Sequence, residues 1–292
     1  MNNYFDIYKN KVQGLVDYIT KYNLKSLVLG ISGGIDSTVT AVIARTACDK
    51  AGIPLIGRSL PTHTNQSSEQ EAARLVGKCF CNDFKEVKFE EIVDEFTYFM
   101  EDREHYVDSS IALGNIKARL RMIYLYHLAW ASGGIVLDTD NLTEHNMGFW
   151  TIHGDEGDVG VLGDLWKTEV FEFAKWLTEI YAEDAFRANE ILEDKAAEEE
   201  LLTKYRAIKM SLELTPTDGN GTAPDLEQYG APSFDIVDEI LSGTINSRDI
   251  PTYDCSEVVL NRYNKSAFKR SHRPFIINKF GKPTNNKGEE LW

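Results

Sequence analysis

The chain has 292 residues, 42% of them hydrophobic and 11% aromatic, which is enough to bury the core of one large domain. Its 31 basic and 46 acidic residues give a net charge of −15, so binding of DNA or RNA over a wide surface is disfavoured. No apolar run approaches the ~20 residues that span a bilayer, and the amino terminus lacks the pattern of a signal peptide. We therefore expect a cytoplasmic protein that binds neither nucleic acid nor membrane.

Helical and strand-like patterns alternate along the chain. Apolar residues recur at helical spacing and predict helices over 1–20, 37–47, 67–78, 90–101, 115–132 and 167–180. Short apolar or alternating runs predict strands over 26–31, 53–60, 84–89 and 135–139. This alternation predicts an α/β fold, a doubly wound parallel sheet flanked by helices, with ligands at the carboxyl ends of the strands.

Two segments differ in composition from the rest. The stretch 182–200 contains eight acidic and two basic residues and has no glycine or proline, which predicts an acidic helical excursion near 182–210. The polar stretch near 280–292 is interpreted as a loose carboxyl-terminal tail. No repeat appears, so we interpret 1–292 as a single domain with these two attachments.

A glycine-rich turn joins the first predicted strand to the helix that follows it. It reads Gly30, Ile31, Ser32, Gly33, Gly34, Ile35, Asp36, Ser37. Adjacent glycines allow the backbone to approach an anion closely, and the amide groups at the start of a helix favour negative charge. Asp36 fits an anion site only if a cation bridges it to the phosphates, and Mg²⁺ suits that arrangement. The turn therefore predicts a nucleotide phosphate site.

This turn does not follow the Walker A pattern, which requires a lysine before the final Ser or Thr. The string Ser32-Gly33-Gly34-Ile35-Asp36-Ser37 instead resembles the signature of the ATP pyrophosphatase, or PP-loop, family. Members of that family have a Rossmann-like fold, release pyrophosphate and leave AMP on the substrate. The resemblance implies the same type of fold and chemistry here.

Two further stretches narrow the resemblance to one branch of that family. They are Gly114-Asn-Ile-Lys-Ala-Arg-Leu-Arg-Met122, and Asp138-Thr-Asp-Asn-Leu-Thr-Glu144 with the Gly148-Phe-Trp150 that follows it. Together with the loop they resemble ammonia-dependent NAD synthetase from roughly residue 10 to residue 225. That enzyme joins ammonia to the carboxylate of deamido-NAD (nicotinic acid adenine dinucleotide).

The resemblance implies roles on the ATP side of the site. Asp36 and Glu144 match the Mg²⁺ ligands of the family. Thr139 and Lys167 match residues that contact ATP, and Thr217 resembles a threonine that also meets ATP. Asp36, Glu144 and Lys167 are accordingly the expected catalytic residues. The other ATP contacts are expected from the main chain and hydroxyl groups of the loop.

On the acceptor side, Arg119 and Lys269 resemble residues that bind deamido-NAD, and Asp158 resembles the aspartate that holds its nicotinate end. The chain departs from the family here more than on the ATP side. Ile152-His153 stands where a lysine is usual, and the loop before Asp158 is one residue shorter, so that match needs a gap.

The reaction implied by the resemblance is adenylation of the acceptor carboxylate by ATP, followed by attack of ammonia. ATP, deamido-NAD, ammonia and Mg²⁺ are thus the expected partners and cofactor. Members of the family are homodimers, so a homodimer is expected. The match occupies most of the chain and leaves no room for a glutaminase domain, which favours free ammonia as the nitrogen donor; delivery by a separate glutaminase subunit is the alternative.

Two other interpretations remain open from the sequence. The same loop occurs in GMP synthetase, argininosuccinate synthetase and tRNA-modifying enzymes, so another adenylating ligase is an alternative. The net charge of −15 and the absence of a Cys-x-x-Cys pair disfavour the tRNA enzymes. A second alternative is a non-catalytic module that only binds ATP.

Overall fold

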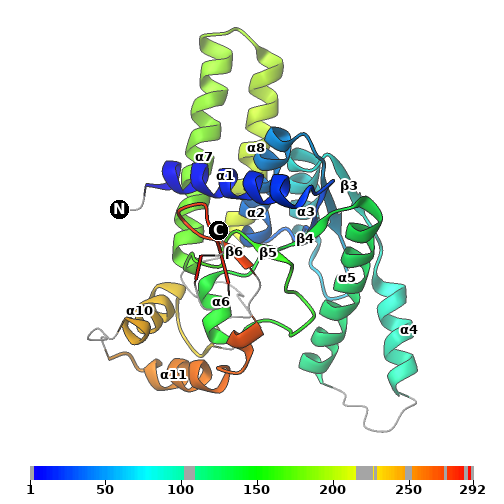
Figure 1. Cartoon of the computed structure of the whole chain (residues 1–292), viewed down its shortest axis with the longest axis vertical. Coiled ribbons are helices and arrows are strands. Elements are labelled where there is room, and N and C mark those ends of the chain that lie inside the picture. The colour runs from blue at the N-terminus through cyan, green and yellow to red at the C-terminus, as the bar shows by residue number, and fades with distance from the viewer. Residues whose placement is uncertain are drawn as a thin grey trace.

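The structure, a computed structural model, describes residues 3–101, 109–214, 226, 229–246, 252–272, 275–285 and 289–290. Within these residues seven strands form one sheet in the order β3-β2-β1-β4-β5-β6-β7 (Figure 1). The strands are β1 (Leu27–Gly30), β2 (Leu55–Ser59), β3 (Asp83–Glu86), β4 (Ile135–Asp138), β5 (Val159–Gly160), β6 (Phe275–Ile277) and β7 (Pro283–Thr284). Neighbouring strands are parallel, except that β7 is antiparallel to β6. The predicted α/β fold with a parallel sheet is confirmed.

Helices connect the strands and cover the sheet. They are α1 (Tyr4–Tyr22), α2 (Ile35–Ala51), α3 (Ser67–Phe80), α4 (Glu90–Glu101), α5 (Ser110–Ser132), α6 (Leu142–Met147), α7 (Lys167–Glu190), α8 (Lys195–Leu214), α10 (Phe234–Ile245), α11 (Ser256–Lys265) and the 3₁₀ helix η1 (Lys269–His272). Among the described residues no helix is long and apolar enough to cross a bilayer.

Two apolar cores lie on opposite faces of the sheet because side chains alternate along each strand. On β1, Leu27 and Leu29 join the larger core, to which α1, α2, α3, α7 and α8 contribute. Val28 joins a smaller core with residues of α4 and α5, such as Val93 and Leu125. Because both faces of β1 are buried, its sequence is an uninterrupted apolar run, as the sequence predicted for this strand.

The predicted acidic excursion corresponds to a helical hairpin. Helix α7 continues to Glu190, ten residues beyond its predicted end, and α8 returns antiparallel to it (Figure 1). Ala185 and Ala188 are buried on the inner side of the hairpin, whereas Phe186 is 64% exposed. The outer part of the hairpin therefore buries small apolar side chains between its two helices, and it extends away from the sheet.

Several elements near the carboxyl terminus have no counterpart among the predicted elements. Strands β5, β6 and β7 contain only two or three residues each, which is too short for a period of two to be recognised. Part of the stretch interpreted as a loose tail forms β7, whose backbone pairs with β6. The sheet is thus extended by segments that are defined by their neighbours rather than by their own sequence.

Two helical glycines offer a matched test of this packing. A methyl group on Gly77 of α3 would lie 2.1 Å from the ring of Phe84, whereas one on Gly114 of α5 would meet nothing within 4 Å. We expect Gly77→Ala to lower the free energy of unfolding by about 1–3 kcal/mol through overpacking. Gly114→Ala should raise it by about 0.4–1 kcal/mol, because alanine restricts the unfolded chain. Urea unfolding of both variants measures this, and equal effects would contradict the packing described.

Candidate active site at the ends of strands β1 and β4

The glycine-rich turn leaves the carboxyl end of β1 and leads directly into α2. Gly33 has φ of 89°, and a side chain there would lie 2.4 Å from the carbonyl oxygen of Glu69 on α3. Only glycine fits such a position without strain. Gly34 is the N-cap residue of α2 and provides no side-chain cap, so the first amide groups of the helix are available to an anion.

The hydroxyl groups of the turn are held by hydrogen bonds within it. The Oγ atoms of Ser32 and Ser37 lie 3.0 Å apart, and the backbone N–H of Gly34 donates to Ser32 Oγ at 3.2 Å. Ser37 Oγ also donates to the carbonyl oxygen of Gly34 at 3.0 Å. The side chain of Ile35 is fully buried in the larger core, so only its main chain can serve a ligand.

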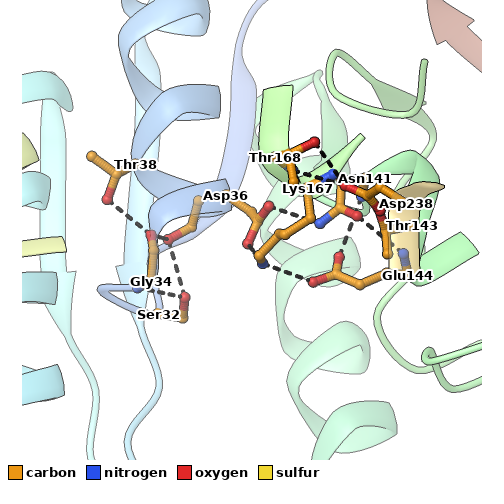
Figure 2. A network of polar contacts seen from close by, with 11 residues as sticks. Ser32, Gly34, Asp36, Thr38, Asn141, Thr143, Glu144, Lys167, Thr168 and Asp238 are labelled. Atoms are coloured by element: carbon orange, nitrogen blue, oxygen red, sulfur yellow. Dashed lines mark hydrogen bonds and ion pairs between the residues drawn. The ribbon is translucent and has the colours of Figure 1, made fainter. Parts of the chain in front are cut away.

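Two carboxylates converge on one ammonium group at the centre of the site (Figure 2). Lys167 Nζ, at the start of α7, lies 2.5 Å from Asp36 Oδ2 and 3.1 Å from Glu144 Oε1. The lysine side chain is only 3% exposed, and those of Asp36 and Glu144 are 16% and 13% exposed. The structure therefore brings the three predicted catalytic residues together from α2, α6 and α7.

Asn141, which the sequence analysis did not select, orients both carboxylates. Its Nδ2 donates to Asp36 Oδ1 at 2.9 Å. Its Oδ1 accepts from the backbone N–H of Glu144 at 3.0 Å, and its own N–H donates to Glu144 Oε2 at 3.3 Å. This reciprocal pair is a capping box at the start of α6. The spacing Asn-x-x-Glu before a short helix was the available signal.

A cavity of about 230 Å³ lies beside the turn, at the carboxyl ends of β1, β2 and β4. Its lining includes the predicted residues Gly30, Ile31, Ser32 and Thr139, together with Ser59, Leu60, Asn65, Arg121, Met122 and Asp155. The cavity therefore combines apolar walls with a few polar groups, as small-molecule sites do.

Arg121 of α5 is a lining residue that the sequence analysis did not select. Its Nε donates to the carbonyl oxygen of Leu60 at 3.0 Å, and its Nη2 donates to Asn65 Oδ1 at 3.2 Å. Burial lowers the pKa of this guanidinium, but an arginine stays protonated in proteins. Nearby in the chain, burial followed by the charges of Asp138 and Asp155 raises the pKa of Asp140 well above its ordinary value.

The predicted acceptor-side residues do not form one group. Arg119 Nε donates to the carbonyl oxygen of Ile152 at 3.3 Å. Lys269 Nζ donates to the carbonyl oxygens of Gly148, at 2.8 Å, and of Trp150. Both cations therefore hold the loop after α6.

Asp158 is placed differently from the other acceptor-side residues. It accepts from the backbone N–H of Val136 at 3.0 Å and from the Tyr126 hydroxyl at 3.2 Å, near the start of β4. It thus lies apart from the carboxyl ends of the strands, where Thr139 lies. Thr217 falls outside the described residues.

The site has the geometry expected for phosphate chemistry, and the comparisons identify its family. The family model for NAD synthase matches residues 7–273. The chain belongs to the NAD synthase family. This agrees with the resemblance drawn from the loop and from the two stretches around Arg119 and Thr139.

Known proteins are similar to this chain over different shares of its length. The NH(3)-dependent NAD(+) synthetase of Thermoplasma acidophilum is 35% identical over 175 residues, which cover 58% of this chain and 68% of that protein. The enzyme of the same name from Saccharolobus solfataricus is 32% identical over 233 residues, covering 78% and 80%. The solved NMN synthetase of Francisella tularensis has the same fold, with a TM-score of 0.71, 24% identity and coverage of 92% and 97%.

Removal of the Lys167 ammonium tests the central ion cluster. In Lys167→Met, Asp36 and Glu144 lose the cation that they share. Breaking a buried ion pair costs about 3–5 kcal/mol, and we expect the lower end because both carboxylates keep some exposure. Thermal and urea unfolding in the presence of EDTA measure the loss.

The matched control for this variant is Lys175→Met, on the same helix. Lys175 pairs with Glu172 at 2.7 Å, but both side chains are more than half exposed. An exposed pair contributes about 0–1 kcal/mol, so this variant should unfold nearly as the wild type does. Equal stability of the two variants would show that the carboxylates do not depend on Lys167.

Proposed function

We propose that this protein is an ammonia-dependent NAD synthetase, which amidates deamido-NAD to NAD with ATP and releases AMP and pyrophosphate. The observation that carries the proposal is the convergence of Asp36, Glu144 and Lys167 beside the glycine turn, in a chain of the NAD synthase family. Such an arrangement of two carboxylates and one ammonium suits the polyphosphate of ATP and its divalent cation.

We place the triphosphate on the turn and the adenosine in the adjoining cavity. The amides after Gly34 and the hydroxyl groups of Ser32 and Ser37 would bind the phosphates. The apolar residues Leu60 and Met122 line the cavity that would accept the base. Thr217 remains a proposed ATP contact from the family resemblance.

The residues present fit a Mg²⁺ ion. Asp36 and Glu144 provide hard carboxylate oxygens that already converge on a cation, the Lys167 ammonium. Mg²⁺ commonly binds one or two carboxylates together with the oxygens of the substrate phosphates. When bound, the ion would neutralise charge on the departing pyrophosphate.

The chemistry then follows in two steps. First, a carboxylate oxygen of deamido-NAD attacks the α-phosphorus of ATP, the bond to the β-phosphate bridge breaks, and pyrophosphate leaves. The role of Lys167 is to stabilise negative charge on that leaving group. Second, the nitrogen of ammonia attacks the carbonyl carbon, AMP leaves with the former carboxylate oxygen, and one proton is released. No side-chain nucleophile is required, since positioning and electrostatics lower the barrier.

For the acceptor we propose a site between the cavity and the loop 148–152. Arg119 and Lys269 border this loop and remain the proposed cationic contacts. Asp155 lines the cavity, whereas both oxygens of Asp158 are engaged near the start of β4. We therefore assign to Asp155 the contact with the nicotinate end that the family resemblance had suggested for Asp158.

The chain is proposed to act as a homodimer joined through α4 and α5. The outward side chains Ile111, Ile123 and Trp130 of α5 are 70%, 67% and 86% exposed, and Tyr98 of α4 is 75% exposed. A twofold axis along these helices would bury the exposed apolar side chains of both copies in one isologous interface.

The remaining expectations belong to this proposal as well. A biosynthetic enzyme that consumes ATP is expected in the cytoplasm, and the net charge of −15 is unfavourable for nucleic-acid partners. We propose that the chain forms a single synthetase domain from which the α7–α8 hairpin projects.

An assay with defined acceptors tests the proposed reaction. With ATP, Mg²⁺, ammonium and deamido-NAD, the wild type should form NAD⁺, AMP and pyrophosphate in equal amounts. Asp36→Asn should lower kcat by about 10²–10³-fold, because stabilisation of the leaving group is lost. Asp49→Asn, an exposed acid on the same helix, is the control and should keep wild-type turnover.

Other acceptors separate the alternatives. Nicotinic acid mononucleotide is included because the fold neighbour is an NMN synthetase, and XMP because GMP synthetase has the same loop signature. Faster turnover with either compound than with deamido-NAD would refute the acceptor proposed above. If the protein binds ATP but forms no AMP or pyrophosphate with any acceptor, it is a non-catalytic ATP-binding module.

The dimer is tested by sedimentation. Trp130→Glu buries a charge in the proposed interface and should shift the protein from dimer to monomer at micromolar concentration. Phe186→Glu places the same charge on the hairpin, at a side chain that is 64% exposed, and should leave the dimer intact. Dissociation by the hairpin variant alone would assign the interface to α7 and α8 instead.

A further inference from the structure

A buried carboxylate outside the predicted site lies against the residues that carry it. Asp238 of α10 is 6% exposed. Its Oδ2 accepts from the backbone N–H of Thr168 at 3.0 Å and from Thr168 Oγ1 at 2.8 Å. Its Oδ1 accepts from Thr143 Oγ1, as Figure 2 shows. A buried carboxylate with three donors is anchored firmly, and it joins α6 and α7 to α10.

These contacts complete the amino terminus of α7 with groups from other elements. The helix begins at Lys167, and the N-cap residue is Trp166, whose indole cannot accept a hydrogen bond. The backbone N–H of Lys167 instead donates to Thr143 Oγ1 at 2.8 Å, and that of Thr168 donates to Asp238. The first two free amides of α7 are therefore capped by α6 and α10.

The residues that form this cap adjoin the proposed catalytic groups in the sequence. Thr143 precedes Glu144 on α6, and Lys167 is itself the first residue of α7. One turn before Asp238, the ring of Phe234 lies 5.5 Å from Lys167 Nζ. One face of α10 thus contacts the Lys167 ammonium through Phe234 and the first turn of α7 through Asp238.

We propose that Asp238 is a positioning residue, which acts through Thr143 and Thr168 to hold Lys167 and Glu144 at the spacing that the polyphosphate requires. This inference rests on the proposed function and adds to it a residue that does not touch the substrate. Displacement of the α7 terminus by even 1 Å would alter the contacts of Lys167 with Asp36, and errors of that size at an active site are costly.

The electrostatics of Asp238 agree with this role. Burial raises its pKa to about 6, while the hydrogen bonds from Thr143 and Thr168 act in the opposite direction. At neutral pH the group is therefore ionised and can accept all three hydrogen bonds. A neutral apolar residue would avoid the cost of burying the charge but would leave the α7 amides unpaired.

The test compares Asp238→Asn with Asp235→Asn on the same helix, where Asp235 is exposed. The amide of Asn cannot accept at both of its atoms, so α7 and α6 lose part of their connection. We expect kcat per folded enzyme to fall about 10–100-fold, the usual cost of losing an outer partner of a catalytic group, with little change in the KM of the acceptor. Asp235→Asn should stay within about twofold of the wild type.

Two further measurements separate positioning from a general loss of structure. Affinity for Mg²⁺-ATP, measured by calorimetry without acceptor, should weaken in Asp238→Asn and does not depend on amide formation. Thr143→Val removes the hydroxyl between Asp238 and Lys167 while it leaves the carboxylate in place, and it serves if Asp238→Asn folds poorly. When Thr143→Val is combined with Asp238→Asn, kcat should fall little further, because both substitutions break the same chain of hydrogen bonds from Asp238 through Thr143 to Lys167.

The outcomes distinguish this inference from the proposed function. A wild type that forms no NAD⁺ refutes the function, and the calorimetry still decides the role of Asp238. A wild type that forms NAD⁺, with Asp238→Asn equal to Asp235→Asn in kcat and in ATP affinity, overturns the inference alone. Losses for Asp238→Asn and Thr143→Val that multiply would also overturn it, since the two residues would then act independently.

Discussion

The geometry of the candidate active site depends on one ammonium group that is shared by two carboxylates. Lys167 Nζ lies between Asp36 and Glu144 at 2.5 and 3.1 Å, in surroundings from which water is largely excluded. Without this cation the two acids would repel each other across the site. The same cluster joins α2, α6 and α7, so the groups proposed to bind ATP also stabilise the junction between these helices.

The loop and the strands that frame it could be predicted because their signals are local. Gly33 and Gly34 follow an apolar strand and precede a helix, and the structure places this turn at the carboxyl end of β1. Lys167 and Glu144 could be assigned only through a family pattern. Asp238 offered no signal, since its contacts with Thr143 and Thr168 arise from the packing of α10, which is a tertiary event.

The acceptor side was harder to predict for a physical reason. Its cations donate to main-chain carbonyl oxygens, as Lys269 does to Gly148. Every residue has such an oxygen, so the residue types in the sequence do not indicate which one is the partner. Asp158 illustrates the difficulty further, because it binds the start of β4, whereas Asp155, three residues earlier in the same glycine-rich loop, lines the cavity. The position of a side chain at the end of a strand can be predicted from the sequence, whereas that of a side chain in a loop of altered length cannot.

The sequence separation of the catalytic groups has a consequence for biogenesis. Asp36 and Lys167 are 131 residues apart, and Lys11 of α1 reaches across 266 residues to the carbonyl oxygen of Ile277 on β6. A nascent chain with only its first 160 residues synthesised has the glycine turn but lacks the lysine that neutralises Asp36. Contacts between residues so far apart in the sequence form late in folding, so the proposed ATP site is completed long after its glycine turn has been synthesised.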